Sequence, residues 1–146
     1  MKFISHRGNL AGADPGKENR PSYIKEAMRA GYDVEIDVWF FNGGWFLGHD
    51  DPTHAIELDF LMNNKLLCHA KNLAALDKML VHTNIHCFWH QEDHYSITSK
   101  GYIVSYPGYD TTKKTICMKP ELASEESVND CYAICSDYIQ KWGANV

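Results

Sequence analysis

The feature of this sequence that most limits its fold is a series of short apolar runs spread along the whole chain. Seven runs have the length and composition of β-strands: residues 2–5, 33–40, 65–70, 85–89, 102–105, 115–118 and 131–135. Most of them are continuously apolar, which is typical of parallel strands that are buried on both faces. We therefore expect an α/β fold that is built on a parallel sheet.

Reactive side chains gather at the C-terminal ends of these runs. His6 follows the first run, His69 lies near the end of the third, and His90 follows the fourth. Lys119 and Asp137 follow the last two runs. In parallel α/β barrels the functional side chains lie at the C-terminal ends of the strands. We therefore expect one shared site there. Lys119 and Asp137 are candidates by position only, and His90 either lines the pocket or caps the next turn.

The second run carries two acidic residues in an apolar setting. Glu35 and Asp37 alternate with Val34, Ile36 and Val38, and side chains two residues apart share a face of a strand. Two neighbouring buried carboxylates repel each other and lose hydration, unless a cation or a proton lies between them. The pattern favours a metal site. The alternative is the exposed acidic face of an edge strand.

The connections between the runs are short. Asn42-Gly43-Gly44 predicts a hairpin turn whose returning strand covers residues 45–47. Pro21 suits the first turn of a helix that Gly31 ends, and Asn72 is a good N-cap for a helix over residues 73–80. Shorter helical segments are predicted at residues 52–62, 124–129 and 139–146, and a helical turn is predicted after residues 90–93.

Length limits how complete such a barrel can be. An ordinary (β/α) barrel needs about 200 residues or more, and this chain has 146. We therefore predict a single domain, residues 1–146, that folds as a miniaturised, irregular (β/α) TIM-like barrel with several outer helices reduced to turns. The alternative is a doubly wound open sheet, but the sequence lacks the Gly-rich dinucleotide loop that would support it.

Composition and charge limit the possible functions of the protein and the cellular compartments in which we expect it. No apolar run reaches membrane-spanning length, and the N-terminus has no basic-then-apolar leader. The five cysteines are odd in number and form no Cys-x-x-Cys pair, so we expect reduced core thiols in a cytoplasmic protein. The net charge of -5 argues against a nucleic-acid partner, and it requires local cations to meet any phosphate.

A set of short motifs in the first third of the chain carries a family resemblance. In order, they are His6-Arg7-Gly8, Glu18-Asn19, Gly31, Glu35-x-Asp37, Gly43-Gly44 and His49-Asp50. Their order and spacing resemble the N-terminal signature of glycerophosphodiester phosphodiesterases, which belong to the phospholipase-C-like phosphodiesterases and are built on a (β/α) barrel. The chain resembles a short, divergent member, because the remaining two thirds match the family only weakly.

The resemblance implies roles for individual residues. His6 and His49 match the two catalytic histidines, one a general base and the other a general acid. Arg7 matches the arginine that binds a phosphate oxygen. Asn19 matches the asparagine of a Glu-Asn-Thr motif, although Arg20 stands where threonine is expected.

The same resemblance implies a divalent metal ion, held by Glu35 and Asp37. The family's third ligand belongs to a Glu-x-Lys motif, for which this chain has His69-Ala70-Lys71. Lys71 keeps the role of a phosphate-binding lysine, and His69 becomes the third ligand. Two carboxylates and one imidazole favour Mg²⁺ or Mn²⁺ over Ca²⁺.

The expected function is metal-dependent hydrolysis of a small phosphodiester, resembling a glycerophosphodiester or a related phosphorylated sugar or lipid headgroup. One alternative is a relative that binds such a phosphate without cutting it. Another is a lyase that stops at a cyclic phosphate. The segment after Asp51 is shorter than in family members, which predicts an open, shallow site. Missing outer helices would also expose apolar sheet surface, which a second copy of the chain could cover.

Overall fold

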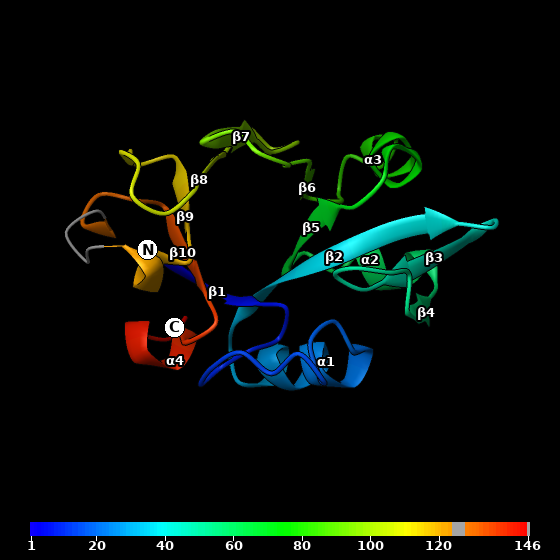
Figure 1. Cartoon of the computed structure of the whole chain (residues 1–146), viewed down its shortest axis with the longest axis horizontal. Coiled ribbons are helices and arrows are strands. Elements are labelled where there is room, and N and C mark those ends of the chain that lie inside the picture. The colour runs from blue at the N-terminus through cyan, green and yellow to red at the C-terminus, as the bar shows by residue number, and fades with distance from the viewer. Residues whose placement is uncertain (124–127, 146) are drawn as a thin grey trace.

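The computed structural model describes residues 1–123 and 128–145. Within them the chain forms a mixed α/β structure around a ten-stranded sheet that curls into a partial barrel, with helices on its outer side (Figure 1). The curled parallel sheet confirms the expected α/β barrel-like class.

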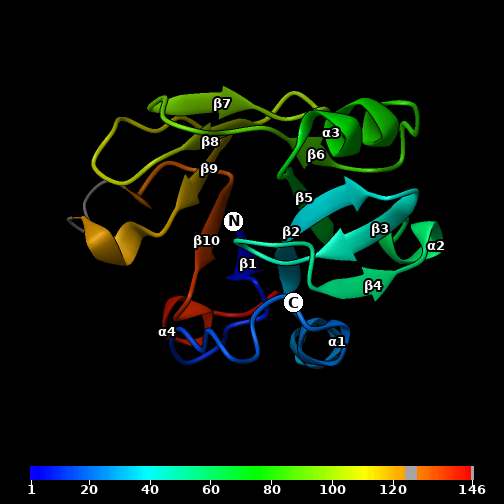
Figure 2. The same cartoon turned by 45° about the vertical axis from the view of Figure 1, so that its right-hand side comes forward.

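The parallel strands follow one another around the curl in chain order. From β1 (Lys2–His6) the sheet continues on one side through β2 (Asp33–Phe41), β5 (Leu66–Ala70) and β6 (Cys87–Phe88), and on the other through β10 (Ala133–Ser136), β9 (Thr115–Met118) and β8 (Ile103–Ser105). The first and last of these strands are thus neighbours, which is the order of a barrel-like sheet and not of a doubly wound one. The curl of the sheet is visible from two directions (Figures 1 and 2).

Ser99 connects the two ends of this curl. Its backbone N–H donates to the Cys87 carbonyl at 2.8 Å, and its hydroxyl accepts from the Cys87 N–H at 3.0 Å. The same hydroxyl donates to the Ile85 carbonyl at 3.1 Å. The segment that leads into β8 is thereby fastened to β6.

Three antiparallel strands extend the sheet, and two of them correct the sequence-based expectations. β3 (Gly44–Leu47) is the predicted return of the hairpin. Residues 52–62 were predicted to be helical, but they form β4 (His54–Ile56) and only then α2 (Leu58–Leu61), because Ile56 pairs across the sheet with Trp45. The helical turn predicted after residues 90–93 is instead β7 (Tyr95–Ile97), which pairs with β8.

The two longer helices begin and end where the sequence predicts. α1 (Pro21–Arg29) buries Ile24 against the sheet, and Gly31 follows it with a φ of 99°. α3 (Leu73–Leu80) is capped by the Asn72 side chain, which accepts a hydrogen bond from the Ala75 N–H.

Two short helical elements follow β9 and β10. η1 covers Pro120–Leu122, and α4 covers Ile139–Trp142, which is shorter than the predicted 139–146. The helix predicted at residues 124–129 falls mostly on residues 124–127, which lie outside the described part of the chain.

The apolar core lies on both sides of the curled sheet. The larger cluster fills the space between the outer face of the sheet and helices α1 and α3, and a second cluster fills the interior of the curl around Ile4, Leu67 and Ile116. All five cysteines are buried, as expected for core thiols. In the part of the chain that the structure describes, no helix has the length and apolar character needed to cross a membrane.

His86 makes the stability of the fold depend on pH in the acidic range. It is half-buried with Nε2 2.7 Å from the Thr98 hydroxyl, and burial, aided by the Lys100 charge, lowers its pKa from 6.5 to about 4. Between these values the unfolded chain binds a proton that the folded chain does not. Stability is therefore full above pH 6.5 and falls as the pH drops through this window, by about 1 kcal/mol after discounting for solvent screening.

We expect the His86→Gln variant to lose this part of the pH dependence. Urea unfolding at pH 7 and pH 5 should show a smaller difference between the two pH values than in the unmodified protein. His94→Gln, at an exposed position, is the control and should keep the original difference. An unchanged difference in His86→Gln would show that another group causes the effect.

Candidate functional site

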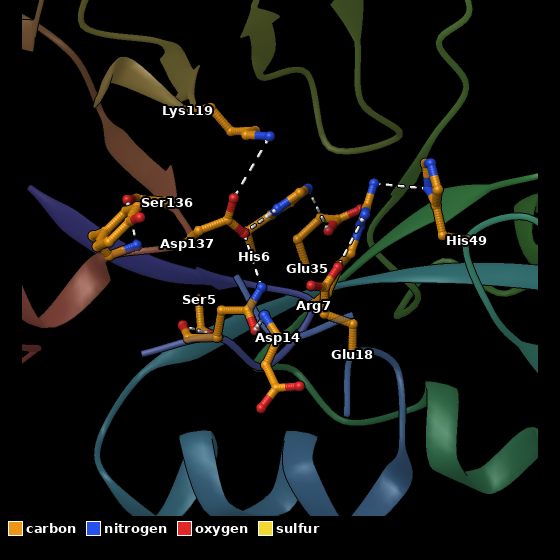
Figure 3. Close-up of polar contacts among 12 residues, drawn as sticks. Ser5, His6, Arg7, Asp14, Glu18, Glu35, His49, Lys119, Ser136 and Asp137 are labelled. Atoms are coloured by element: carbon orange, nitrogen blue, oxygen red, sulfur yellow. Dashed lines mark hydrogen bonds and ion pairs between the residues drawn. The ribbon is translucent and has the colours of Figure 1, made fainter. Parts of the chain in front are cut away.

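The register of three adjacent strands brings the predicted site residues to one end of the sheet. His6 lies opposite Glu35 across β1 and β2, and Asp37 lies opposite His69 across β2 and β5. Because the strands are parallel, all four side chains belong to the same C-terminal edge. Figure 3 shows His6, Arg7 and Glu35 turned toward one another at this edge.

Glu35 and Asp37 are buried and incompletely satisfied. Their residues are 1% and 0% exposed. Within the described chain, Glu35 Oε2 and Asp37 Oδ1 have no hydrogen-bond partner. Buried carboxylate oxygens without a donor are costly. A cation that binds both acids would remove this cost.

His69 completes the cluster of groups that could hold such a cation. Its Nδ1 lies 3.3 Å from Asp37 Oδ1 and 3.8 Å from Glu35 Oε1. The ligand atoms of these three residues all lie within 4.8 Å of one another. The ring stacks on Phe88 with its centroid 4.8 Å away.

The contact of His69 Nε2 determines which ring nitrogen carries the proton in the neutral side chain. Nε2 lies 3.2 Å from the His90 carbonyl oxygen, which can only accept, so Nε2 carries a proton. A neutral His69 therefore presents the lone pair of Nδ1 to the two carboxylates. This arrangement is repulsive unless a metal ion or a second proton lies between them.

The two acids differ in their protonation. Burial, followed by the charge of Asp37, raises the pKa of Glu35 well above its ordinary value, against the opposing charges of Arg7 and Lys71. Burial also acts to raise the pKa of Asp37, but the adjacent His49 and His69 rings and the charge of Arg7 hold it well below its ordinary value. The surroundings of Asp37 thus favour its ionised form, whereas burial opposes the ionisation of Glu35, which a bound cation would favour.

Arg7 links the acids to the second histidine. Its Nε lies 3.1 Å from Asp37 Oδ2, and one terminal nitrogen donates to Glu18 Oε1 at 3.0 Å. The other terminal nitrogen lies 2.7 Å from His49 Nδ1 and donates to it. Burial acts to lower the pKa of Arg7, but the charges of Asp37 and Glu35 outweigh it and raise that pKa. The guanidinium therefore stays charged beside the cluster.

Asn19 fixes the orientation of Asp37. Its side-chain N–H donates to Asp37 Oδ2 at 2.9 Å, and its side-chain oxygen accepts from the Asp37 backbone N–H, also at 2.9 Å. Asn19 is 1% exposed and has a φ of 65°, and Arg7 has a φ of 59°. Left-handed backbone is strained for residues with a Cβ. Asn19 and Arg7 thus both contact Asp37 from a strained backbone conformation.

His6 is held by a second carboxylate, Asp137, which follows β10. His6 Nδ1 donates to Asp137 Oδ1 at 2.7 Å, and Nε2 faces Glu35 Oε2 at 3.6 Å. Burial acts to raise the pKa of Asp137, but hydrogen bonds from His6 and Asn9 and the charge of Lys119 keep it well below its ordinary value. With its Nδ1 proton directed to Asp137, His6 presents Nε2 to the site.

His49 lies on the other side of the acids and is more exposed, with 45% of its side chain open to solvent. Its Nδ1 lies 3.6 Å from Asp37 Oδ2, and its Nε2 lies 3.7 Å from Asp50 Oδ1. The turn before it depends on Gly48, because a Cβ at that residue would lie 1.9 Å from the Asp51 carbonyl oxygen.

Hollows open on both sides of the cluster. On the His6 side a hollow of about 260 Å³ also reaches His90, Tyr106 and Lys119. On the His49 side a more polar hollow of about 460 Å³ is lined by residues 15–20 and 48–54. Arg7 borders both hollows, so a group bound to its guanidinium could extend into either.

The structure brings together all seven residues proposed for catalysis, phosphate binding and metal binding. These are His6, Arg7, Glu35, Asp37, His49, His69 and Lys71. Lys71 follows β5, and its charge acts on Glu35. Of the positional candidates, Lys119 lies 3.5 Å from Asp137, and His90 lines the hollow.

Two contributors were missed by the sequence reasoning. Asn9 is 0% exposed and donates to Asp137, and its place in the loop after His6 was the available signal. Tyr106 stacks on His90 with ring centroids 3.5 Å apart. It follows β8, so its position at a strand end was the same signal that identified Lys119.

Comparison with known proteins adds no identification. No family model, no curated protein and no solved structure matches this chain.

Proposed function

We propose that this protein is a metal-dependent phosphodiester hydrolase on a reduced TIM-like barrel, similar to glycerophosphodiester phosphodiesterases. The observation that supports it most is the set of unpartnered buried oxygens on Glu35 and Asp37, which face the Nδ1 of His69. A cation would stabilise these buried atoms, which lie between Arg7 and the two histidines His6 and His49.

Glu35, Asp37 and His69 fit a divalent metal ion by their donor types and their spacing. Mg²⁺ is our first choice, with Mn²⁺ and Ca²⁺ as alternatives. When bound, the ion would neutralise a phosphodiester and stabilise the charge that develops on its oxygens. Arg7 and Lys71 supply two further positive charges at the same place, and Arg7 offers the fork of N–H donors that matches a phosphate.

His6 and His49 each carry out one of the two proton transfers. His6 accepts a proton on Nε2 from the attacking water or hydroxyl, because its Nδ1 proton is already held by Asp137. As a P–O bond forms to that oxygen, the bond to the leaving alcohol breaks. His49 donates a proton from Nε2 to the leaving oxygen as an imidazolium, so its Nδ1 must also carry a proton and Arg7 must release its contact with that nitrogen.

A second candidate is a module that binds phosphates without cutting them. It is favoured by His69, which places a neutral imidazole where the resemblance implies a third acidic metal ligand. Such a module would hold phosphate with Arg7 and Lys71 and need no divalent ion.

Phosphorus NMR of an aryl phosphodiester incubated with the protein tests the proposal. We expect a phosphomonoester to accumulate with Mg²⁺ or Mn²⁺ and to stop forming when EDTA is added. A glycerophosphodiester, whose free hydroxyl can attack its own phosphorus, is incubated in parallel, and a cyclic phosphate as its final product would assign a lyase. A shifted or broadened substrate signal without product, in every metal tested, would refute hydrolysis and leave the binding module.

A further inference from the structure

A third hollow lies at the opposite end of the curled sheet from the acidic cluster. Its volume is about 230 Å³. Its lining comes from the N-terminal ends of the parallel strands, where β1 begins at Lys2, β2 at Asp33 and β5 at Leu66. The site described above uses the C-terminal ends, so the two places share no residue.

Backbone hydrogen bonds build this end of the sheet. The Lys2 N–H donates to the Tyr132 carbonyl and the Val34 N–H to the Lys65 carbonyl, each at 2.8 Å. These bonds set the charged ends of neighbouring strands side by side. The buried side chains of Ile4 and Leu67 close the floor.

Positive charge dominates the rim of the hollow. Lys2, Lys65 and Lys100 line it, and Asp33 is the one ionisable acid in its lining. Lys2 pairs with Asp33 at 3.5 Å. Across the described chain, neither Lys65 nor Lys100 has an ion pair within 4.0 Å. The chain as a whole carries a net charge of -5, so this excess of cations is local.

Hydroxyl donors form one wall. Tyr102 and Tyr132 stack with ring centroids 4.2 Å apart. Burial, followed by a hydrogen bond with Tyr102, raises the pKa of Tyr132 to about 12, so its phenol stays protonated at neutral pH. The side chains that meet an entering group therefore include ammonium groups and phenols, which donate hydrogen bonds, beside the single Asp33 carboxylate, which Lys2 pairs with.

We propose that this hollow binds a small phosphate, either inorganic phosphate or a phosphomonoester. Two unpaired ammonium groups match the charge of a phosphate dianion, and charge-assisted hydrogen bonds are the strong ones. The volume is below the roughly 300 Å³ at which pockets for drug-sized ligands begin, so the hollow suits a compact anion. This proposal is independent of the proposed hydrolase activity.

Calorimetric titration with inorganic phosphate, in EDTA to remove divalent ions, tests the site. We expect saturable binding with a Kd below about 1 mM. Lys65→Gln and Lys100→Gln should each weaken binding by about tenfold, because each removes a charge-assisted contact. Methyl phosphate is titrated in parallel. Binding as tight as that of phosphate indicates a phosphomonoester ligand, whereas binding of phosphate alone indicates the free anion.

One other lysine variant makes the result specific. Lys25→Gln removes one charge from an exposed position on α1 and should bind phosphate as the unmodified protein does. The proposal is overturned if neither anion saturates up to about 10 mM, if Lys25→Gln loses as much affinity as Lys65→Gln, or if neither Lys65→Gln nor Lys100→Gln weakens binding.

Discussion

The Glu35→Gln variant is expected to lose about 1,000-fold in metal-dependent phosphodiester hydrolysis, because it removes a charged ligand from the metal and from the developing transition state. The substitution keeps the shape of the side chain. It therefore separates the loss of charge from any loss of packing in the core, where Glu35 is 1% exposed.

The same variant should be more stable than the unmodified protein when no metal is bound. Burial raises the pKa of Glu35 well above its ordinary 4.5. Between 4.5 and that raised pKa, the folded chain holds a proton that the unfolded chain has lost, so stability falls as the pH rises. Glutamine does not titrate, and we expect it to relieve about 1–2 kcal/mol at neutral pH.

Added metal should reverse this ranking. A ligand at 100 times its Kd stabilises the folded state by about 2.7 kcal/mol, which corresponds to a rise in Tm of about 5–10 °C for a domain of this size. We expect that rise in the unmodified protein and little of it in Glu35→Gln.

Thermal unfolding with EDTA and with Mn²⁺, together with aryl phosphodiester turnover, measures both effects. Glu57→Gln, an identical change at an exposed residue, is the matched control and should change neither. If Glu35→Gln kept full turnover and the metal-dependent rise in Tm, Glu35 would not be a ligand.

The Asp137→Asn variant is expected to lower kcat by about 100-fold while changing KM little. Asp137 Oδ1 accepts a hydrogen bond from His6 Nδ1 at 2.7 Å, which keeps Nε2 free to accept a proton. An asparagine amide can present its N–H₂ to Nδ1 instead, which would place the His6 proton on Nε2. A carboxylate that orients a catalytic histidine contributes on this scale or more.

The split between kcat and KM distinguishes this role from a general structural one. Steady-state kinetics on the aryl phosphodiester, combined with urea unfolding, should show a low kcat in a folded protein. Asp130→Asn, at an exposed position, is the control. A raised KM with unchanged kcat would instead place Asp137 in substrate binding.

The parts of the fold that the sequence predicted are those governed by local pattern and continuous burial. The second strand was predicted at residues 33–40 and observed at Asp33–Phe41, because residues 34–38 are buried on both of its faces. Helix α1 followed from Pro21 and Gly31, which restrict the backbone wherever they occur. The shared site was predicted because the C-terminal ends of parallel strands lie at one edge of the sheet, so the polar residues there come close together.

The parts that were missed depend on partners distant in the sequence. Tyr95–Ile97 has no strong strand signal of its own and becomes a strand because β8 offers it a pairing edge. Asn9 reaches Asp137 across 128 positions of the chain, a contact that no local pattern encodes. The hollow at the other end was missed for the same reason, since its lysines meet only when the sheet curls.

Hydrogen bonds of Ser99, and not a complete ladder of paired strands, join the two ends of the curled sheet. One residue supplies two hydrogen bonds to Cys87 and a third to Ile85, so closure there depends on a single serine instead of a strand–helix unit. A small domain thereby joins the two ends of its curled sheet with few residues. Because so few hydrogen bonds hold this joint, the curl would open here first, away from the strands that carry the acids.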